Sequence, residues 1–309
     1  MKIFLFLTLF VFHCAQAQEF FSFLTPNTPQ TSIEMEGGFS PQRDMDGGKD
    51  KTHVWSSAVG ANQKIYDDGK NLVTLGGKWQ KLDLTAQSKE LNDFYNIQGS
   101  IGYRRMLENN NFAFGSLSYG SASDRPFKSN RDNTLNANYI QKFSPKWFGL
   151  LNYSNNRTFL NNIPLPGFFY VKEMTAERGM IIGFPIFYYM TPVGENYSLR
   201  YFGILPWTHR LKFLYTKYKF ILPYIGYEQA PQTYFRDARE ERKDRFFWFE
   251  RRVGMGVEGG LARGFRFDFY TGWAFDRQFY EARNFSEKKK FLINLESAPF
   301  AQLNLRYAF

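Results

Sequence analysis

Residues 264–280 read GFRFDFYTGWAFDRQFY, and apolar and polar side chains alternate along this stretch. The odd positions carry mostly aromatic side chains, and the even positions carry mostly charged or small ones. The odd positions are Phe265, Phe267, Phe269, Thr271, Trp273 and Phe275, and the even positions are Arg266, Asp268, Tyr270, Gly272, Ala274 and Asp276. Because successive side chains of a β-strand point to opposite sides, this period of two predicts a strand with one aromatic face and one polar face.

The same period recurs through the rest of the chain, with short turn-like segments between the alternating stretches. The alternating stretches include 33–39, 95–104, 135–143 and 199–205, and the separators are 66–71, 107–111, 143–147, 191–196 and 262–264. Residues 72–84 and 110–120 lose the alternation midway, which we interpret as β-bulges or misplaced boundaries. No segment long enough to form a helix shows the apolar period of a helix, so the chain is predicted to be all-β and antiparallel.

The first 17 residues have the pattern of an export signal. Lys2 precedes an apolar run at 3–12 that contains one polar residue, Thr8, and Ala15 and Ala17 form the A-x-A arrangement before a cleavage site. We expect cleavage after Ala17, which would also remove Cys14, the one cysteine of the chain. A membrane anchor or buried helix made from this segment, or a lipid on Cys14, remains an alternative.

The composition limits what the exported chain can be. Aromatic residues make up 19% of the chain, with 35 Phe and 19 Tyr, yet the mean hydropathy is −0.44. No segment after residue 17 approaches 18 consecutive apolar residues, which excludes transmembrane helices. The formal net charge of +10 suits an anionic partner, but nucleic acid is not expected for an exported protein.

Alternation alone fits two kinds of protein. In a soluble β-protein the apolar face turns inward, whereas in a membrane barrel it faces lipid and the polar face lines the lumen. The aromatic residues crowd the apolar faces, as in the girdles at the two bilayer interfaces of membrane barrels. The polar faces carry few long hydrophobic residues and many Gly, Asn and Ser, as a wet lumen would. Both observations favour a barrel in a membrane.

The final residues 301–309, AQLNLRYAF, carry a family resemblance. They resemble the last strand of bacterial outer-membrane β-barrel proteins, which alternates and ends in an aromatic residue; the middle of the chain looks like an uncharacterised barrel family. The resemblance implies an outer-membrane location, contact with outer-membrane lipid, and recognition of the last strand by the barrel assembly machinery. The residues in the matching positions are Leu303, Leu305, Tyr307 and Phe309.

We therefore predict one antiparallel transmembrane β-barrel formed by residues 18–309. Membrane strands of about 9–11 residues with their connections give about 12 strands, with about 10 or about 14 as alternatives. Two long polar loops are expected near 155–177 and 230–245, and the dense mixed charge of the second is interpreted as solvated.

If the apolar faces meet lipid, a set of charged residues must point into the lumen. A surplus of inward arginine would favour anionic solutes, whereas pairing with acids would make a salt-bridged filling; the second interpretation leads. The predicted lumen-facing charges are Arg104, Lys142, Arg200, Arg252, Arg266, Arg306, Glu258 and Asp268, with Glu34, Glu36 and Asp276 as further counter-charges.

The residues offer little for catalysis. After residue 17 the histidines are His53 and His209, and along one strand His53 is too far from Ser57 to form a catalytic pair. Acidic pairs at 44–46 and 67–68 suit turns better than metal sites. We expect no cofactor and no metal. The leading hypothesis is a non-enzymatic narrow channel or a structural surface barrel; the alternatives are a lipid-modifying outer-membrane enzyme and a soluble exported β-protein.

Overall fold

The computed structural model describes residues 31–309, except residues 46–47, 49, 85–90, 92, 176, 205–206, 219, 263 and 288. The expected signal segment at 1–17 lies outside the described residues. Within them, no helix is long and apolar enough to span a membrane.

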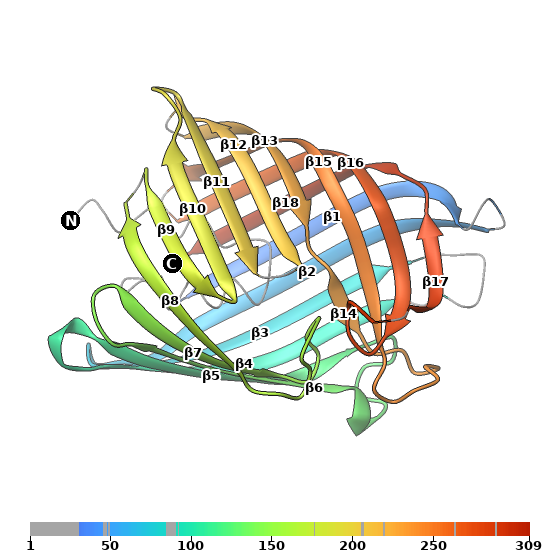
Figure 1. Cartoon of the computed structure of the whole chain (residues 1–309), viewed down its shortest axis with the longest axis horizontal. Coiled ribbons are helices and arrows are strands. Elements are labelled where there is room, and N and C mark those ends of the chain that lie inside the picture. Colours follow the sequence, from blue (N-terminus) through green and yellow to red (C-terminus); the bar gives the residue numbers. More distant parts are fainter. Residues whose placement is uncertain are drawn as a thin grey trace.

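Antiparallel strands form one closed ring, in which each strand pairs with the next along the chain and the last pairs with the first (Figure 1). This confirms the predicted all-β antiparallel barrel. The sixteen strands of the ring are β1 (Ser32–Met45), β2 (Asp50–Asp67), β3 (Asn71–Asp83), β4 (Phe94–Met106), β5 (Phe112–Ser123), β6 (Asn133–Lys142), β7 (Trp147–Ser154), β8 (Leu165–Met174), β9 (Gly179–Phe184), β10 (Ile186–Pro192), β11 (Tyr197–Ile204), β12 (Thr208–Tyr215), β13 (Ile221–Gln229), β15 (Arg245–Ala262), β16 (Phe265–Ala282) and β18 (Ala298–Ala308).

Two short strands lie outside the closed ring. β14 (Gln232–Tyr234) follows β13 after two residues and pairs with the start of β15. β17 (Lys290–Leu295) precedes β18 and pairs with the end of β16. Both strands lengthen the sheet at the end of the barrel opposite to the C-terminal residue, Phe309.

The predicted count of about 12 strands is wrong. The estimate assigned one uniform length to every strand and connection, but β9, β10 and β11 have only 6, 7 and 8 residues. Residues 179–204 therefore hold three strands where the estimate allowed about one. The range 155–177, predicted as a loop, likewise contains all of β8.

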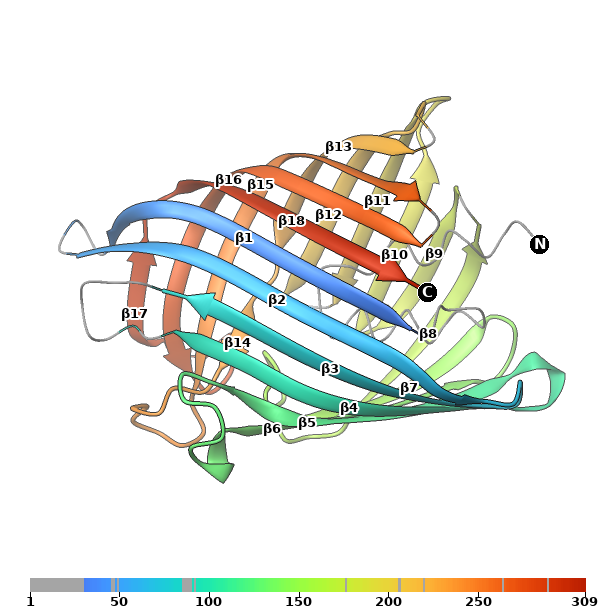
Figure 2. The ribbon, with the colours of Figure 1, turned by 180° about the vertical axis from the view of Figure 1, so that it is seen from behind.

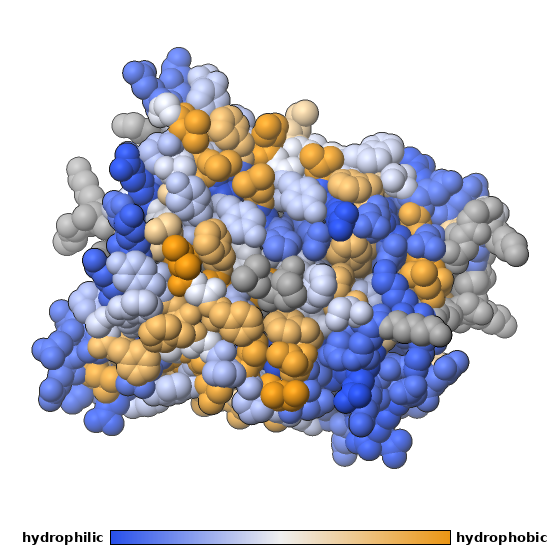
Figure 3. Space-filling view, viewed as in Figure 1, coloured by the Kyte–Doolittle hydropathy of each residue, from blue (hydrophilic) through white to orange (hydrophobic). Residues whose placement is uncertain are grey.

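The outer face of the barrel is apolar, as the alternation predicts. On β16, Phe269 and Trp273 are 42% and 47% exposed, whereas Tyr270 and Ala274, the residues that follow them, are buried. Figure 3 shows orange apolar residues across the middle of the barrel and blue hydrophilic residues towards both ends. Since water would not stabilise such a surface, the wall is built to face lipid, which contradicts the soluble alternative.

The interior is more apolar than predicted. β5 shows why: Phe112 and Phe114 point inward and are buried, whereas Leu117 and Tyr119 point outward and are exposed. Its pairing with β4 and β6 runs without a register shift, so the lost alternation at 110–120 is not a bulge. The apolar period fails there because both faces are apolar, one against lipid and one inside the barrel.

The two ends of the barrel differ. The C-terminus and short turns, such as 68–70, 143–146 and 193–196, share one end, and the longer connections share the other. In outer-membrane barrels the short turns are periplasmic and the long loops extracellular. We name the ends accordingly.

The height of the wall varies around the ring. The strands β1 to β5, β15 and β16 run the length of the molecule, as Figure 2 shows from behind. In contrast β9 to β12 have 6–8 residues, and in Figure 1 their extracellular tips end midway along the barrel.

Candidate functional site in the barrel interior

A cavity of about 240 Å³ lies inside the barrel. One wall is formed mostly by neutral amides on β3, β4, β6 and β7, with Lys78 of β3 among them, and the opposite wall by charged residues on β1, β13 and β15. Apolar residues at the tips of β8, β10 and β11 form one side of it, including Leu165, Ile186 and Ile204. The interior thus offers both hydrogen-bonding groups and an apolar surface.

The amide wall is a connected array. The Nδ2 of Asn152 donates to the Oδ1 of Asn138 at 2.5 Å, and the Nδ2 of Asn138 donates to the Oγ of Ser116 at 3.3 Å. The Oδ1 of Asn136 is buried beside the cavity and accepts no hydrogen bond from the described residues. Amides donate and accept without carrying charge, so this wall suits neutral polar groups.

A charged network centred on Glu258 lies nearer the periplasmic end, outside the lining of this cavity. The Glu258 carboxylate contacts Arg200 and lies 2.8 Å from the Nζ of Lys212, which is also 2.7 Å from Asp268. The hydroxyl of Tyr224 donates to Asp268 at 2.6 Å. Arg200, Glu258 and Asp268 were predicted to point inward, but Lys212 of β12 and Tyr224 of β13 were missed because their strands were not among the alternating stretches.

A second network lies nearer the extracellular end. Glu250 contacts Arg252 and lies 3.1 Å from the Nε of Arg277. The Nη1 of Arg252 donates to Gln302 at 2.6 Å, and the Nε2 of Gln302 donates to Glu36 at 3.1 Å. In a separate pair, Arg210 and Glu228 are 2.6 Å apart. The interior charges are therefore tied to one another across strands.

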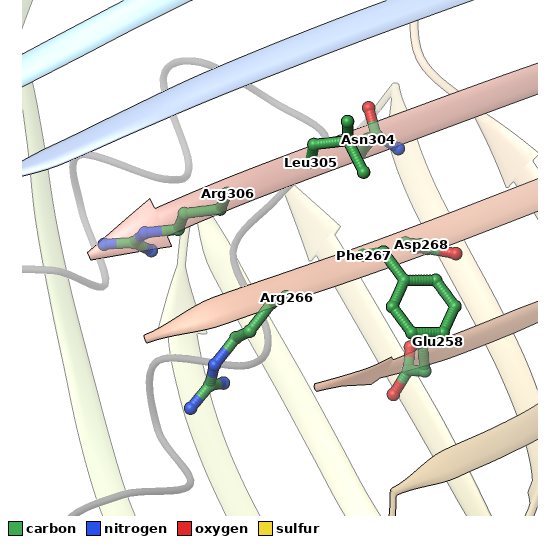
Figure 4. A pocket seen from close by; sticks show the side chains of 7 residues that line it. All are labelled: Glu258, Arg266, Phe267, Asp268, Asn304, Leu305 and Arg306. Carbon is green, nitrogen blue, oxygen red and sulfur yellow. The ribbon is translucent and has the colours of Figure 1, made fainter. Parts of the chain in front are cut away.

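Arg266 and Arg306 lie beside each other near the periplasmic end. They are paired residues of β16 and β18, and their guanidinium groups point the same way, as Figure 4 shows. The Nε of Arg306 is 3.4 Å from Glu34, while Glu258 and Asp268 line the other side of the same small pocket. These predicted residues therefore share one region of the interior.

The other predicted positions are more scattered. Arg104 is buried on β4, and the Nζ of Lys142 donates to the carbonyl of Asn110 in a periplasmic turn. Asp276 is exposed, and not inward as expected, because its φ of 50° and the register shift opposite it turn it out towards Arg251. Of the four residues predicted as the insertion signal, Leu303, Tyr307 and Phe309 are exposed on the outer face and Leu305 is half-exposed.

An extracellular connection, residues 155–164, reaches the cavity. Arg157 holds it in place: its guanidinium donates to the carbonyls of Phe159, Leu160 and Ile163 and to the side chain of Asn152. Arg157 and Phe159 both line the cavity. The loop therefore narrows the lumen from inside, and one arginine organises it.

Replacing Arg157 by alanine is expected to widen the lumen. The substitution leaves three loop carbonyls and an amide oxygen without their charged donor, and charged hydrogen bonds contribute about 1.5–3 kcal/mol each. Solute flux through reconstituted protein should rise, and the loop should become sensitive to protease. Arg131→Ala, at an exposed loop position, is the matched control; unchanged flux and protease resistance in Arg157→Ala would show that the loop does not restrict the lumen.

Neither histidine lines the cavity. His53 lies on the outer face of β2, with its Nε2 3.6 Å from Asp83, and the Nδ1 of His209 is 2.7 Å from the hydroxyl of Tyr201 on the outer face of β11. The described residues contain no group of three or more potential metal ligands. Both histidines of the described residues therefore lie on the outer face of the barrel and not beside the cavity.

The charged segment 235–244 belongs to the loop that was predicted at 230–245 and interpreted as simply solvated. Its side chains instead form ion pairs with neighbouring extracellular loops. Asp237 pairs with Arg125 and Lys128 of the neighbouring loop, and Arg239 lies 2.6 Å from Asp132. The hydrogen bond from Lys128 is the main reason that the pKa of Asp237 is below its ordinary value. The mixed charge therefore ties extracellular loops together.

Comparison with known proteins assigns no family to this chain. No family model and no curated protein matches the chain. Solved structures that are similar include an outer membrane channel of Pseudomonas putida F1 (9% identity, 91% of this chain and 96% of that chain, TM-score 0.38). Others are the Pseudomonas putida toluene transporter TodX (8% identity, 91% and 90%, TM-score 0.35) and LpxR from Salmonella typhimurium (6% identity, 90% and 100%, TM-score 0.33).

The chain forms a β-barrel of the outer-membrane type. This conclusion depends on the closed antiparallel ring and its apolar outer face. The similar structures have different activities, and their low TM-scores assign none of these to this chain.

Proposed function

We propose that this barrel is a narrow outer-membrane channel for small uncharged solutes. The supporting observation is the cavity of about 240 Å³ that has neutral amides on one wall and paired charges on the other. An apolar cavity of about 150 Å³ holds benzene, so this volume suits a solute of about ten non-hydrogen atoms.

The pairing of charges argues against anion selectivity. Each group of interior cations in the described networks has a similar number of carboxylates beside it, so the field of the arginines is largely cancelled. The balanced groups are Arg200 and Lys212 with Glu258 and Asp268, Arg210 with Glu228, and Arg252 and Arg277 with Glu250 and Glu36. The sequence predicted a basic lumen, whereas the charges in these three networks nearly cancel.

Swelling of proteoliposomes tests the proposal with three solutes of similar size and different charge: arabinose, glutamate and lysine. We expect arabinose to enter fastest, because neither ion can replace its hydration shell in a neutral, amide-lined lumen. Raffinose, which is larger than the cavity, should stay outside. Faster entry of glutamate would instead support an anion channel, and no entry of any solute would support a structural barrel.

A further inference from the structure

The segment that joins β13 to β15, residues 230–244, crosses the extracellular mouth of the barrel, and we call it the strap. β13 and β15 are neighbours in the ring, whereas β5 is separated from β15 by β16, β18 and β1 to β4. The strap nevertheless pairs with the end of β5. The backbone N–H of Phe235 donates to the carbonyl of Ala122 at 2.7 Å, and the N–H of Asp124 donates to the carbonyl of Phe235 at 3.3 Å. The chain thus leaves one wall, contacts the opposite wall and returns.

The strap covers the cavity directly. Its first residues, 230–234, all line the cavity. Tyr234 is 1% exposed, and its ring packs on Phe94 of β4 with the ring centroids 5.1 Å apart. The Oγ1 of Thr233 donates to the carbonyl of Asn156 at 3.2 Å, and the Nδ2 of Asn156 donates to the carbonyl of Thr233 at 3.1 Å. A solute that moves between the cavity and the extracellular side therefore meets the strap.

Beyond β14, exposed ion pairs fasten the strap to the loop that follows β5. Asp237 lies 2.7 Å from the Nζ of Lys128 and 3.1 Å from the Nη1 of Arg125, and these two cationic side chains are 51% and 58% exposed. Arg239 lies 2.6 Å from Asp132 of the same loop. Exposed ion pairs are weak and are screened by salt, whereas the strands of the ring are joined by continuous ladders of backbone hydrogen bonds. The strap can therefore detach from this loop while the ring stays closed.

Other contacts tie the strap to its own wall. Arg236 forms an ion pair with Glu281 of β16, and the carboxylate of Asp244 lies 3.0 Å from the Nζ of Lys290 of β17. β14 also pairs with the start of β15. These contacts do not involve the opposite wall, so they hold the strap beside β15 and β16 when its contacts with β5 and the following loop break.

We propose that the strap is the extracellular gate of the cavity. It covers the cavity while its ion pairs with residues 124–132 hold, and it admits solute when those pairs break and the strap swings towards its own wall. The conformation described above is the closed one. The gate rests on the proposed channel function for the passage of solute, but the movement of the strap can be measured without any transport.

A thiol inside the cavity reports whether the strap covers it. Ser56 of β2 lines the cavity, and Ser56→Cys is a nearly isosteric substitution. Cys14, the one cysteine of the chain, lies in the expected signal segment. The rate of modification by an uncharged, water-soluble methanethiosulfonate is measured in proteoliposomes for Ser56→Cys alone and combined with Asp237→Arg or Glu240→Arg. Glu240 is an exposed acid of the same strap, so its substitution is the control with the same change of charge.

We expect Asp237→Arg to make modification of Ser56→Cys about tenfold faster, because it removes two ion pairs and places a third cation beside Arg125 and Lys128. Glu240→Arg should leave the rate unchanged. High salt should speed modification with the native strap, because it screens the ion pairs, and should do so less with Asp237→Arg. Equal rates in all three proteins, or the same acceleration by Glu240→Arg, would overturn the proposal.

Cross-linking tests whether the same movement admits solute. Lys128→Cys and Asp237→Cys are combined in one protein, joined with a short bis-methanethiosulfonate, and released with dithiothreitol. Swelling of proteoliposomes in arabinose should be slow while the two positions are joined and several-fold faster after release, and Lys128→Cys alone, treated in the same way, should not change. Equal arabinose entry in the joined and released protein would overturn the gate and leave the channel intact. Faster modification of Ser56→Cys by Asp237→Arg without arabinose entry in any variant would refute the channel and support the moving strap.

Discussion

Glu258→Ala is expected to destabilise the folded barrel by about 3–5 kcal/mol, the usual cost of removing one partner from a buried ion pair. The side chains of Arg200 and Glu258 are only 4% and 7% exposed, so the substitution leaves Arg200 buried without its carboxylate. Lys212 keeps Asp268 but loses its second acceptor. Urea unfolding in lipid vesicles, followed by tryptophan fluorescence, measures the change.

A double substitution separates the charge effect from the loss of packing. Combining Glu258→Met with Arg200→Met removes one charge of each sign and leaves Lys212 paired with Asp268, so most of the stability should return. Glu195→Ala, in an exposed turn, should change little. Equal destabilisation by the single and double variants would mean that the network contributes through shape and not through charge.

Leu303→Arg is expected to destabilise the barrel by about 2–4 kcal/mol, because it places a cation on the lipid face in the middle of β18. Leu303 is 42% exposed on that face, and β18 pairs with both β1 and β16 to close the ring. Tyr307→Arg, four residues nearer the periplasmic end on the same face, should cost only about 0–1 kcal/mol because the cation reaches the interface.

Refolding yield into vesicles and urea unfolding of the two arginine variants provide the comparison. Leu303→Phe keeps the apolar surface and serves as the control. Equal costs at positions 303 and 307 would contradict a lipid-facing outer wall, since the depth dependence comes from the bilayer.

The period of two, together with the aromatic residues on the apolar faces, was enough to predict the barrel and its outer face, because lipid imposes the same requirement on every strand. It could not predict the interior, where apolar residues such as Phe112 and Phe114 are as acceptable as polar ones when they pack on each other. Because both faces of β5 carry apolar residues, its sequence did not show that it pairs with β4 and β6 in a continuous register. The number of strands was underestimated because strand length is set locally, by where turns such as Pro185 occur, and not by the bilayer alone.

The site was predictable one residue at a time but not as pairs. Inward parity predicted Arg200, Glu258 and Asp268 one by one, and all three are buried, yet their connection through Lys212 depends on register between strands far apart in sequence. The side chain of Asp276 was predicted to point inward, but Asp276 itself has a positive φ, which reverses the inward and outward order from this residue onward. No periodic pattern indicates such a reversal in advance. The role of Arg157 was also missed, since its partners are backbone carbonyls, which leave no trace in side-chain patterns.

Oxygen accessibility of spin labels along β16 tests the central claim most directly, because molecular oxygen concentrates in the hydrocarbon of the bilayer. Nitroxide labels are placed singly at Phe269, Tyr270, Trp273 and Ala274 in reconstituted protein. The apolar outer wall predicts high accessibility at 269 and 273 and low accessibility at 270 and 274, in step with the burial of the native side chains. The reverse pattern, or low accessibility at all four positions, would contradict a barrel whose aromatic face meets lipid.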